Sequence, residues 1–242
     1  MRVAVISDIH SNFHALEAVL AAIDRATPDE IWCLGDLVGY GPHPNRCCRR
    51  VAASATVCLI GNHDLGTLGV LSLEMFSPDA AAACRWSQNV LEPDAREYLL
   101  GRTPFVRRKD VELYHASPRD PVWDYVLTAE AAVESLALTT APLVLIGHTH
   151  VPLALAAEGG SVTGGIAPEG TEVPLDGRRW LLNPGSVGQP RDGDPRAAWL
   201  LIDFDAKQAW FRREEYPVEK TQEEILARGL PEVLATRLAV GQ

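Results

Sequence analysis

The sequence predicts an α/β fold in which a parallel sheet with helical crossovers is stacked on a second, largely antiparallel sheet. In the first half, short apolar runs alternate with amphipathic segments, which is the pattern of βαβ units. The second half changes to closely spaced apolar runs separated by turns, as in antiparallel strands. Between the two halves, residues 66–101 have helical periodicity and interrupt this alternation.

The first half contains three predicted strands, at residues 1–7, 31–35 and 56–61. A helix follows the loop 8–13, and its apolar positions are spaced to pack one face on the sheet: Leu16, Val19, Leu20 and Ile23. The loop 36–42 is rich in turn residues, and Pro44 opens a second helix that runs to about Ala53. The alternation predicts a parallel sheet with the helices as crossovers.

Residues 66–101 are predicted to form a helical cap beside the functional site. Ser77-Pro78-Asp79 and Glu92-Pro93-Asp94 have the composition of helix starts, with proline in the first turn and an acidic residue near the positive end. Trp86 and Tyr98 are interpreted as core of this insertion, although aromatic side chains on a cap can also contact a substrate base.

Beyond the cap, residues 105–115 form a predicted hairpin that turns at Lys109-Asp110, and residues 128–138 a helix with Thr128 as its N-cap. Five more strands are expected, at 153–157, 171–175, 180–182, 198–203 and 208–216. They predict a second, largely antiparallel sheet. The tail, residues 221–240, is helical by pattern, and without a repeat or flexible linker the chain is interpreted as one domain.

Composition excludes several classes of function. The formal net charge of -10 argues against a broad basic surface for nucleic acid. The five cysteines show neither zinc-ligand spacing nor an even-numbered disulfide framework, and no apolar run approaches the length that spans a membrane. An amino-terminal strand in place of a signal peptide, together with unpaired cysteines, favours a cytoplasmic protein.

Five predicted strands end in side chains that can bind metal or move protons. They are followed, in chain order, by Asp8-Ile9-His10, Asp36, Asn62-His63-Asp64, His115 and His148-Thr149-His150. In extended backbone, the spacing of two within Asp8-x-His10 and His148-x-His150 places both side chains on one face. Because open α/β sheets bind ligands at the carboxyl ends of their strands, we expect these residues to form one site.

These motifs resemble the five signature blocks of the calcineurin-like metallophosphoesterases. The blocks are Asp8-x-His10, Gly35-Asp36, Gly61-Asn62-His63-Asp64, His115 and Gly147-His148-Thr149-His150, in the family's order. The strings at 39–42 and 183–188 resemble small bacterial and archaeal members grouped with the YfcE-type phosphodiesterases. The resemblance implies a four-layer αββα sandwich of two mixed β-sheets flanked by helices, with 66–101 as a small cap within a single domain, residues 1–242.

The resemblance also implies a dinuclear metal centre. One ion would be held by Asp8, His10, Asp36 and His150, and the other by Asp36, Asn62, His115 and His148. Two divalent ions about 3.5–4 Å apart can clamp a phosphoryl group and lower the pKa of a shared water. Carboxylate, imidazole and amide ligands suit Mn, Fe, Zn or Ni, and we expect manganese to be the ion in use.

His63 holds the family position of a proton donor to the leaving oxygen, and Asp64 would orient it. An imidazole with a pKa of about 6.5 suits that role near neutral pH.

Other polar residues give weaker signals. Asn12 could meet a phosphate oxygen, but it is equally an ordinary turn residue. Arg191 could clamp a phosphate with two hydrogen bonds, although a surface salt bridge explains it as well. His14 and His43 match no ligand position of the family, and we expect them to be solvated.

The function implied is metal-dependent hydrolysis of a phosphodiester or phosphomonoester, by attack of a hydroxide that bridges the two metals. The substrate would be a small phosphate ester or nucleotide. A dinucleotide polyphosphate hydrolase is a competing interpretation, because related sequences carry the same blocks. A scaffold that kept the fold and lost catalysis, like the retromer subunit that resembles this family, is a third. The retention of His63 and of every metal ligand favours an enzyme.

Overall fold

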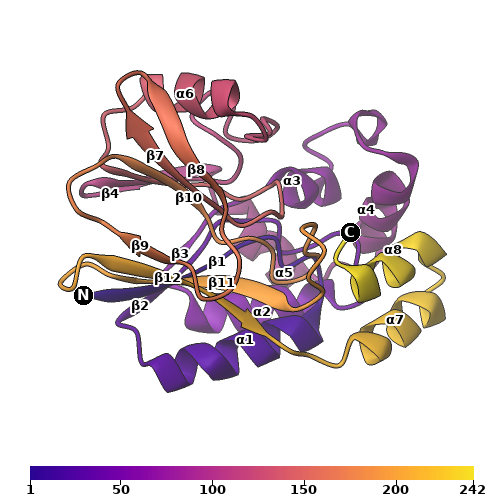
Figure 1. The fold of residues 1–242 in the computed structure, drawn as a ribbon. Coiled ribbons are helices and arrows are strands. Elements are labelled where there is room, and N and C mark those ends of the chain that lie inside the picture. The colour runs from indigo at the N-terminus through magenta and orange to yellow at the C-terminus, as the bar shows by residue number, and fades with distance from the viewer.

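A computed structural model describes residues 1–242 and shows two six-stranded mixed sheets with helices outside them (Figure 1). The first sheet has the order β3-β2-β1-β11-β12-β9 and consists of β1 (Arg2–Ile6), β2 (Glu30–Cys33), β3 (Val57–Cys58), β9 (Glu172–Pro174), β11 (Ala197–Asp203) and β12 (Gln208–Glu214). The second has the order β4-β5-β6-β10-β7-β8 and consists of β4 (Phe105–Arg108), β5 (Val111–Tyr114), β6 (Leu143–Leu145), β7 (Leu153–Glu158), β8 (Ser161–Ile166) and β10 (Trp180–Asn183). The predicted sandwich of two mixed sheets flanked by helices is confirmed.

The expectation that the late strands form a sheet of their own is wrong. β11 pairs antiparallel with β1, in the register Arg2↔Asp203, and β12 and β9 extend the first sheet from there. β7 and β10 instead join the hairpin strands β4 and β5 through β6. Apolar periodicity identifies a strand and its buried faces, but it carries no information about which edge the strand pairs with.

The core between the two sheets is built by alternation along each strand. In β1, Val3 and Val5 belong to the apolar cluster shared by both sheets, whereas Ala4 and Ile6 belong to the cluster under the helices. All four side chains are fully buried. A strand that is apolar on both faces is therefore central, which explains the continuous apolar run at residues 3–6.

Helices cover the outer face of each sheet. The first sheet packs against α1 (Phe13–Ala26), α2 (Pro44–Ser54) and α5 (Pro93–Leu100), and the predicted apolar face of α1 is buried. The second sheet packs against α6 (Ala129–Ala137), where Thr128 Oγ1 accepts a hydrogen bond from Ala131 N at 3.2 Å. The predicted N-cap at Thr128 is thus confirmed.

The remaining helices gather at one end of the sandwich, at the right of Figure 1. They are α3 (Asn62–Leu68), η1 (Leu73–Met75), α4 (Pro78–Val90), α7 (Val218–Ala227), α8 (Glu232–Thr236) and η2 (Arg237–Val240). α4 shares an apolar cluster with α7 and α8, and Trp86 packs against it, while Tyr98 packs on the first sheet's cluster. Both side chains are partly buried, and Tyr98 packs on the first sheet instead of within the predicted cap.

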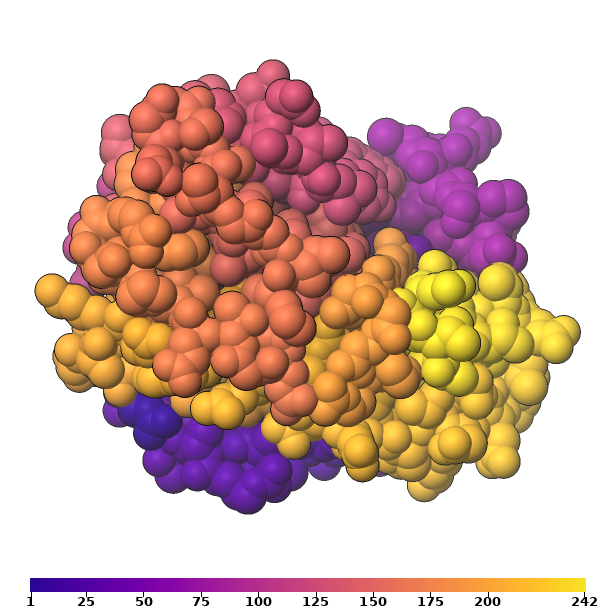
Figure 2. All heavy atoms as spheres, in the orientation of Figure 1, coloured from indigo at the N-terminus to yellow at the C-terminus, as the bar shows by residue number.

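The end of the chain returns to this same region. Figure 2 shows the yellow C-terminal segment packed against the orange segment that precedes β11, and Gly193 N donates to Gly241 O at 3.0 Å. None of the helices combines the length and the apolar character needed to cross a bilayer.

Candidate metal centre

The residues that follow five strand ends converge into two groups of ligand atoms. The donor atoms of Asp8, His10 and His150 lie within 4.8 Å of one another, and so do those of a second group, Asp36, His115 and His148. Asn62, at the start of α3, places its Oδ1 3.2 Å from His115 Nε2. All seven residues predicted as ligands are buried.

Asp36 lies between the two groups. Its Oδ2 is 3.6 Å from His10 Nε2 and 3.6 Å from His115 Nε2. In the first group, Asp8 Oδ1 is 3.4 Å from His150 Nε2. One carboxylate oxygen of Asp36 therefore faces both groups.

Each of the two aspartates predicted as metal ligands has one oxygen held by a backbone amide and one oxygen free. Asp8 Oδ2 accepts from His148 N at 3.0 Å, and Asp36 Oδ1 accepts from His63 N at 2.9 Å. Asp8 Oδ1, Asp36 Oδ2 and His148 Nε2 are buried without any hydrogen-bond partner. Buried polar atoms without partners are costly, and these three all point into the predicted metal centre.

The imidazole tautomers lead to the same conclusion. In His10, His115 and His150, Nδ1 lies 3.1, 2.9 and 2.6 Å from a backbone carbonyl oxygen, those of Val38, Leu34 and Gln189 respectively. A carbonyl only accepts, so Nδ1 carries the proton and Nε2 of each neutral ring presents a lone pair. His10 Nε2 and His150 Nε2 then face each other at 3.0 Å as two acceptors. A cation beside both nitrogens resolves that conflict.

The ligand residues do not lie in extended backbone, so the spacing argument for their shared face is wrong. Asp8, His10, Asp36, His148 and His150 have φ angles of 53°, 48°, 53°, 64° and 62°. This left-handed region is unfavourable for residues with a side chain and is found at functional sites. The side chains converge because the chain turns sharply beyond each strand.

Two glycines make that close approach possible. A Cβ atom at Gly61 would lie 2.0 Å from Asp36 Oδ1, and one at Gly147 would lie 2.2 Å from Ser7 Oγ. No other residue fits at either position without displacing its neighbour. The glycines of the Gly-Asn-His-Asp and Gly-His-Thr-His motifs thus leave room for the aspartate ligands.

Burial controls the protonation of the site. It raises the pKa of Asp8 to about 7 and that of Asp36 well above its usual range. It also lowers the pKa of His10, His148 and His150 well below the usual value for imidazole. The buried site thus disfavours every charged form, and bound cations would supply the charge that keeps the carboxylates ionised.

His63 lies at the edge of the group. Its ring is 4.8 Å from that of His10 and 4.4 Å from that of Tyr40, between ring centroids. Its Nδ1 is 3.6 Å from Cys84 Sγ. Burial lowers the pKa of His63 well below its usual value.

Asp64 does not orient His63, contrary to the expectation. Its Oδ1 accepts from Val38 N at 3.0 Å, and its Oδ2 accepts from Gly61 N at 3.0 Å. These bonds connect the loop after β2 to the turn before α3. Asp64 is a positioning residue for the backbone around the centre, and the His63 ring is instead held by contacts that include Cys84 and Tyr40.

The two candidate substrate contacts differ. Asn12 is the N-cap of α1, with Oδ1 accepting from Ala15 N at 3.2 Å and Nδ2 donating to Gly188 O at 2.9 Å. At 1 % exposure it belongs to the fold, which favours the turn-residue interpretation. Arg191 donates to Gln189 Oε1 at 2.8 Å and to Tyr40 OH at 3.3 Å, and it forms no ion pair with a carboxylate. Tyr40 in turn packs on the His63 ring, so Arg191 reaches the centre through this tyrosine.

His14 and His43 are not solvated, and that expectation is wrong. Their side chains are 13 % and 10 % exposed, and both rings contact Glu224 on α7. No local pattern predicts these contacts, because Glu224 is more than 180 residues away in the chain.

Sequence analysis also missed an aromatic rim at the centre. The exposed ring of Tyr125 lies 4.1 Å from that of His148, and Phe76 packs 5.2 Å from His63 and 5.0 Å from Trp123, all between centroids. Residues 116–127 have no periodicity and match no motif block, so no pattern pointed to Trp123 or Tyr125.

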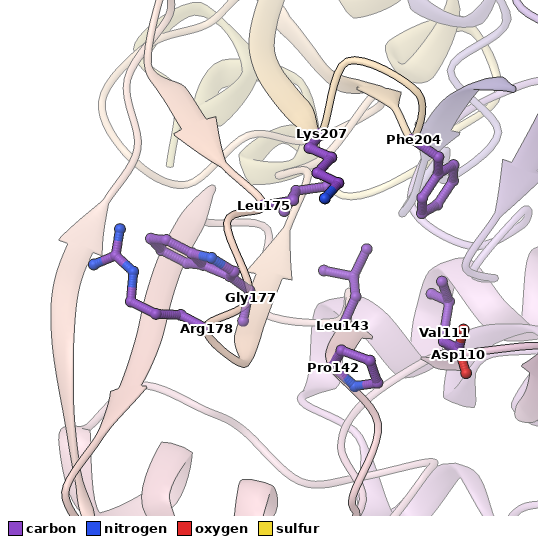
Figure 3. Close-up of a pocket in the computed structure, with 10 residues that line it drawn as sticks. Asp110, Val111, Pro142, Leu143, Leu175, Gly177, Arg178, Phe204 and Lys207 are labelled. Atoms are coloured by element: carbon purple, nitrogen blue, oxygen red, sulfur yellow. The ribbon is translucent and has the colours of Figure 1, made fainter.

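A separate cavity lies away from the metal centre. It has a volume of about 320 Å³ and opens at the amino-terminal ends of β5, β6 and β10, among Val111, Leu143 and Trp180 (Figure 3). The metal-ligand groups follow the carboxyl ends of β5 and β6, so the two features are at opposite ends of the sheet. The cavity is lined mainly by apolar side chains with Arg178 and Lys207 at its edge, and it holds no cluster of ligand or nucleophilic groups.

Comparison with known proteins decides the family. The sequence profile of the calcineurin-like phosphoesterase superfamily domain matches residues 1–207. The chain belongs to this superfamily. A crystal structure of a metallophosphoesterase from Sphaerobacter thermophilus has 40% sequence identity and a TM-score of 0.91, and covers 100% of this chain and 99% of that one. The predicted superfamily is confirmed.

Other relatives of this phosphoesterase differ in how much they share. An uncharacterized protein of Methanocaldococcus jannaschii is 36% identical over 99% of this chain and 98% of its own length. A symmetrical bis(5'-nucleosyl)-tetraphosphatase of Proteus mirabilis is 28% identical, over 72% of this chain and 63% of that protein. The family and its phosphatase relatives support a phosphoester hydrolase.

Proposed function

We propose that this phosphoesterase hydrolyses a phosphodiester or phosphomonoester with two divalent ions bound in the candidate metal centre. The observation that carries the proposal is the set of ligand atoms without partners, Asp8 Oδ1, Asp36 Oδ2 and His148 Nε2, between imidazole nitrogens that present lone pairs. Asp8, His10, Asp36 and His150 would hold one ion, and Asp36, Asn62, His115 and His148 the other. When bound, the ions would polarise the phosphoryl group and supply a nucleophile at neutral pH.

We assign the chain's own contribution to His63 and Arg191. Burial lowers the pKa of His63, so without substrate the ring is neutral and, contrary to the expectation of an ordinary imidazole, does not hold the proton that it would donate. The negative charge of a bound phosphate would favour the protonated ring, which would donate its proton to the leaving oxygen and return to the neutral form. Arg191 has guanidinium donors within reach of the same space, fixed by Gln189 and Tyr40, and would bind a non-bridging phosphate oxygen. The backbone amide of His63 keeps Asp36 in place, so one residue supports both the ligand and the proton transfer.

Manganese is the ion we propose to be in use, because the nitrogen and oxygen ligands contain no thiolate. The five cysteines are all free and buried, which is consistent with a reducing cytoplasm as the place of action. The aromatic rim adds a preference for substrates that carry a base.

A dinucleotide polyphosphate is the second candidate substrate, and the observation that favours it is Tyr125. Its ring is 44% exposed and lies 4.1 Å from the His148 ring, where a nucleobase next to a bound phosphate could stack. The similarity to bis(5'-nucleosyl)-tetraphosphatases supports this candidate.

The test is hydrolysis by metal-stripped protein with Mn²⁺, Ni²⁺ or Zn²⁺ added back singly. Bis-p-nitrophenyl phosphate, p-nitrophenyl phosphate and diadenosine tetraphosphate serve as diester, monoester and dinucleotide substrates. Turnover that depends on metal supports the proposal, and the preferred substrate decides between the two candidates. Two bound ions without turnover of any substrate would contradict it and favour a non-catalytic scaffold.

A further inference from the structure

A second cluster of metal-ligand side chains lies outside the candidate centre. His14 Nε2 and His43 Nε2 lie 2.8 and 2.6 Å from the same oxygen, Glu224 Oε2, and the two imidazole rings are 5.8 Å apart. The ligand atoms of the three residues lie within 4.8 Å of one another. The side chains of His14, His43 and Glu224 are only 13, 10 and 29% exposed, so the cluster is partly withdrawn from water.

Three separate elements contribute to this cluster. His14 lies in the first turn of α1, His43 precedes α2, and Glu224 lies on α7. His43 occupies the N-cap position of α2, yet its side chain makes no capping hydrogen bond and contacts Glu224 instead. The His43 ring therefore does not cap α2 but contacts a residue 181 positions further along the chain.

The protonation states suit metal binding at neutral pH. Burial lowers the pKa of His43, outweighing the raising effect of its hydrogen bond to Glu224, so the imidazole is neutral. Although burial opposes it, the hydrogen bonds from His43 and His14 hold the pKa of Glu224 below its ordinary value. A neutral imidazole and an ionised carboxylate are the forms that bind a metal ion.

We propose that His14, His43 and Glu224 form a third divalent-metal site that fastens α7 to α1 and to the loop before α2. Two imidazoles and one carboxylate suit zinc or a similar first-row ion, with water in the remaining position. Ligands of a tetrahedral zinc ion with bonds of about 2.0 Å are about 3.3 Å apart. The nitrogen-to-oxygen distances of 2.6 and 2.8 Å would thus open by about 0.7 and about 0.5 Å when the ion enters.

A metal ion at this site would stabilise the contacts between helices that lie next to the dinuclear centre. One turn before Glu224, Thr221 Oγ1 donates to Asn12 Oδ1 at 3.1 Å, so α7 already contacts the start of α1. Ile225, the next residue on α7, is buried in the apolar cluster that includes Tyr40. Tyr40 in turn packs on the His63 ring. A metal at Glu224 would therefore hold both the C-terminal helices and the loop that carries Tyr40.

The test counts ions and measures stability in the full chain. Metal-stripped protein is titrated with Zn²⁺, and bound zinc per chain is determined after desalting for wild type, Glu224→Ala and the control Glu223→Ala. Glu223 is exposed on the same helix and belongs to no ligand cluster. We expect Glu224→Ala to bind one ion fewer than wild type, and Glu223→Ala to bind the same number as wild type.

The thermal midpoint separates a metal site from a simple hydrogen-bonded triad. In the Asp36→Ala background, which is expected to lack the dinuclear centre, Zn²⁺ should still raise the midpoint, and Glu224→Ala should abolish that rise. This readout holds whether or not the protein is a phosphoesterase. His14→Gln, which keeps a hydrogen-bond donor but removes the imidazole, should lose the ion as well, and serves if Glu224→Ala does not fold. Equal zinc content in wild type and the folded variants, or an equal response to zinc, would overturn the proposal.

Discussion

Replacing Gly61 with alanine should empty the metal centre without changing any ligand. The added Cβ would lie 2.0 Å from Asp36 Oδ1 and 2.6 Å from His115 Cε1. A carbon and an oxygen in ordinary contact are about 3.3 Å apart, so the Asp36 carboxylate must retreat by about 1.3 Å. The φ angle of Gly61 is -107°, which alanine adopts freely, so the effect is purely steric.

The contacts of Asp36 determine how much metal affinity this substitution should remove. Displacing Asp36 breaks its hydrogen bond from His63 N, now 2.9 Å long, and moves the oxygen that faces both ligand groups. A hydrogen bond to a charged group contributes about 1.5–3 kcal/mol, which is roughly 10- to 150-fold in affinity. Because metal sites tolerate only about 0.2 Å of ligand displacement, the expected weakening of Mn²⁺ binding is at least of this size.

Calorimetric titration of metal-stripped protein with Mn²⁺ measures this effect, with circular dichroism to show that the variant is folded. Gly165→Ala is the matched control, because its Cβ would meet no atom within 4 Å. If Gly61→Ala binds two Mn²⁺ ions with the affinity of wild type, the close approach of Gly61 to Asp36 has no bearing on metal binding and our account of the motif fails.

Three further predictions follow from the same geometry. Asp36→Ala should lose bound metal and activity together. His63→Ala keeps the backbone amide that holds Asp36, so it should retain metal while its turnover falls by a factor of roughly 10²–10⁴. Equal metal loss in both variants would contradict these roles. Tyr125→Ala should raise the KM for diadenosine tetraphosphate about 5- to 150-fold while leaving inhibition by inorganic phosphate unchanged, since stacking contributes about 1–3 kcal/mol per base; parallel changes in both would argue against stacking. Chelation should lower the thermal midpoint of the wild type, because it leaves Asp8 and Asp36 with buried oxygens that have no partner. Relative to protein with metal at 100 times its Kd, the loss of stability is about 2.7 kcal/mol. An unchanged midpoint would show that the centre contributes nothing to stability.

The ligand residues could be found from sequence because each follows an apolar strand in a short motif. Asp8 and His148 are examples, since an apolar run followed by polar ligands can be recognised within a few positions. The sequence pattern does not show why these side chains converge. The pattern predicts extended backbone at residues such as Asp8 and His148, whereas both have left-handed φ angles. Tertiary contacts impose this conformation, for example the hydrogen bond from His148 N to Asp8 Oδ2.

Long-range pairing explains the remaining differences. β1 pairs with β2 on one edge and with β11 on the other, and nothing local in residues 197–203 distinguishes an edge of the first sheet from an edge of the second. Likewise, the sequence predicts that His14 and His43 are solvated, because their shared partner, Glu224, lies far along the chain on α7. The family resemblance implies that Asp64 orients His63, but the oxygens of Asp64 bond to Gly61 N and Val38 N, which only the folded turn brings into reach.

The position of β11 has a consequence for synthesis on the ribosome. β1 leaves the exit tunnel early, but the edge that it offers is filled only by β11, in the register Arg2↔Asp203. At about 5–20 residues per second, roughly 10–40 s of translation separate the two strands. During that interval, an apolar strand with unpaired amide and carbonyl groups is open to other chains. α1 can cover one face of that strand but not its edge, so the edge stays open until residues 197–203 emerge.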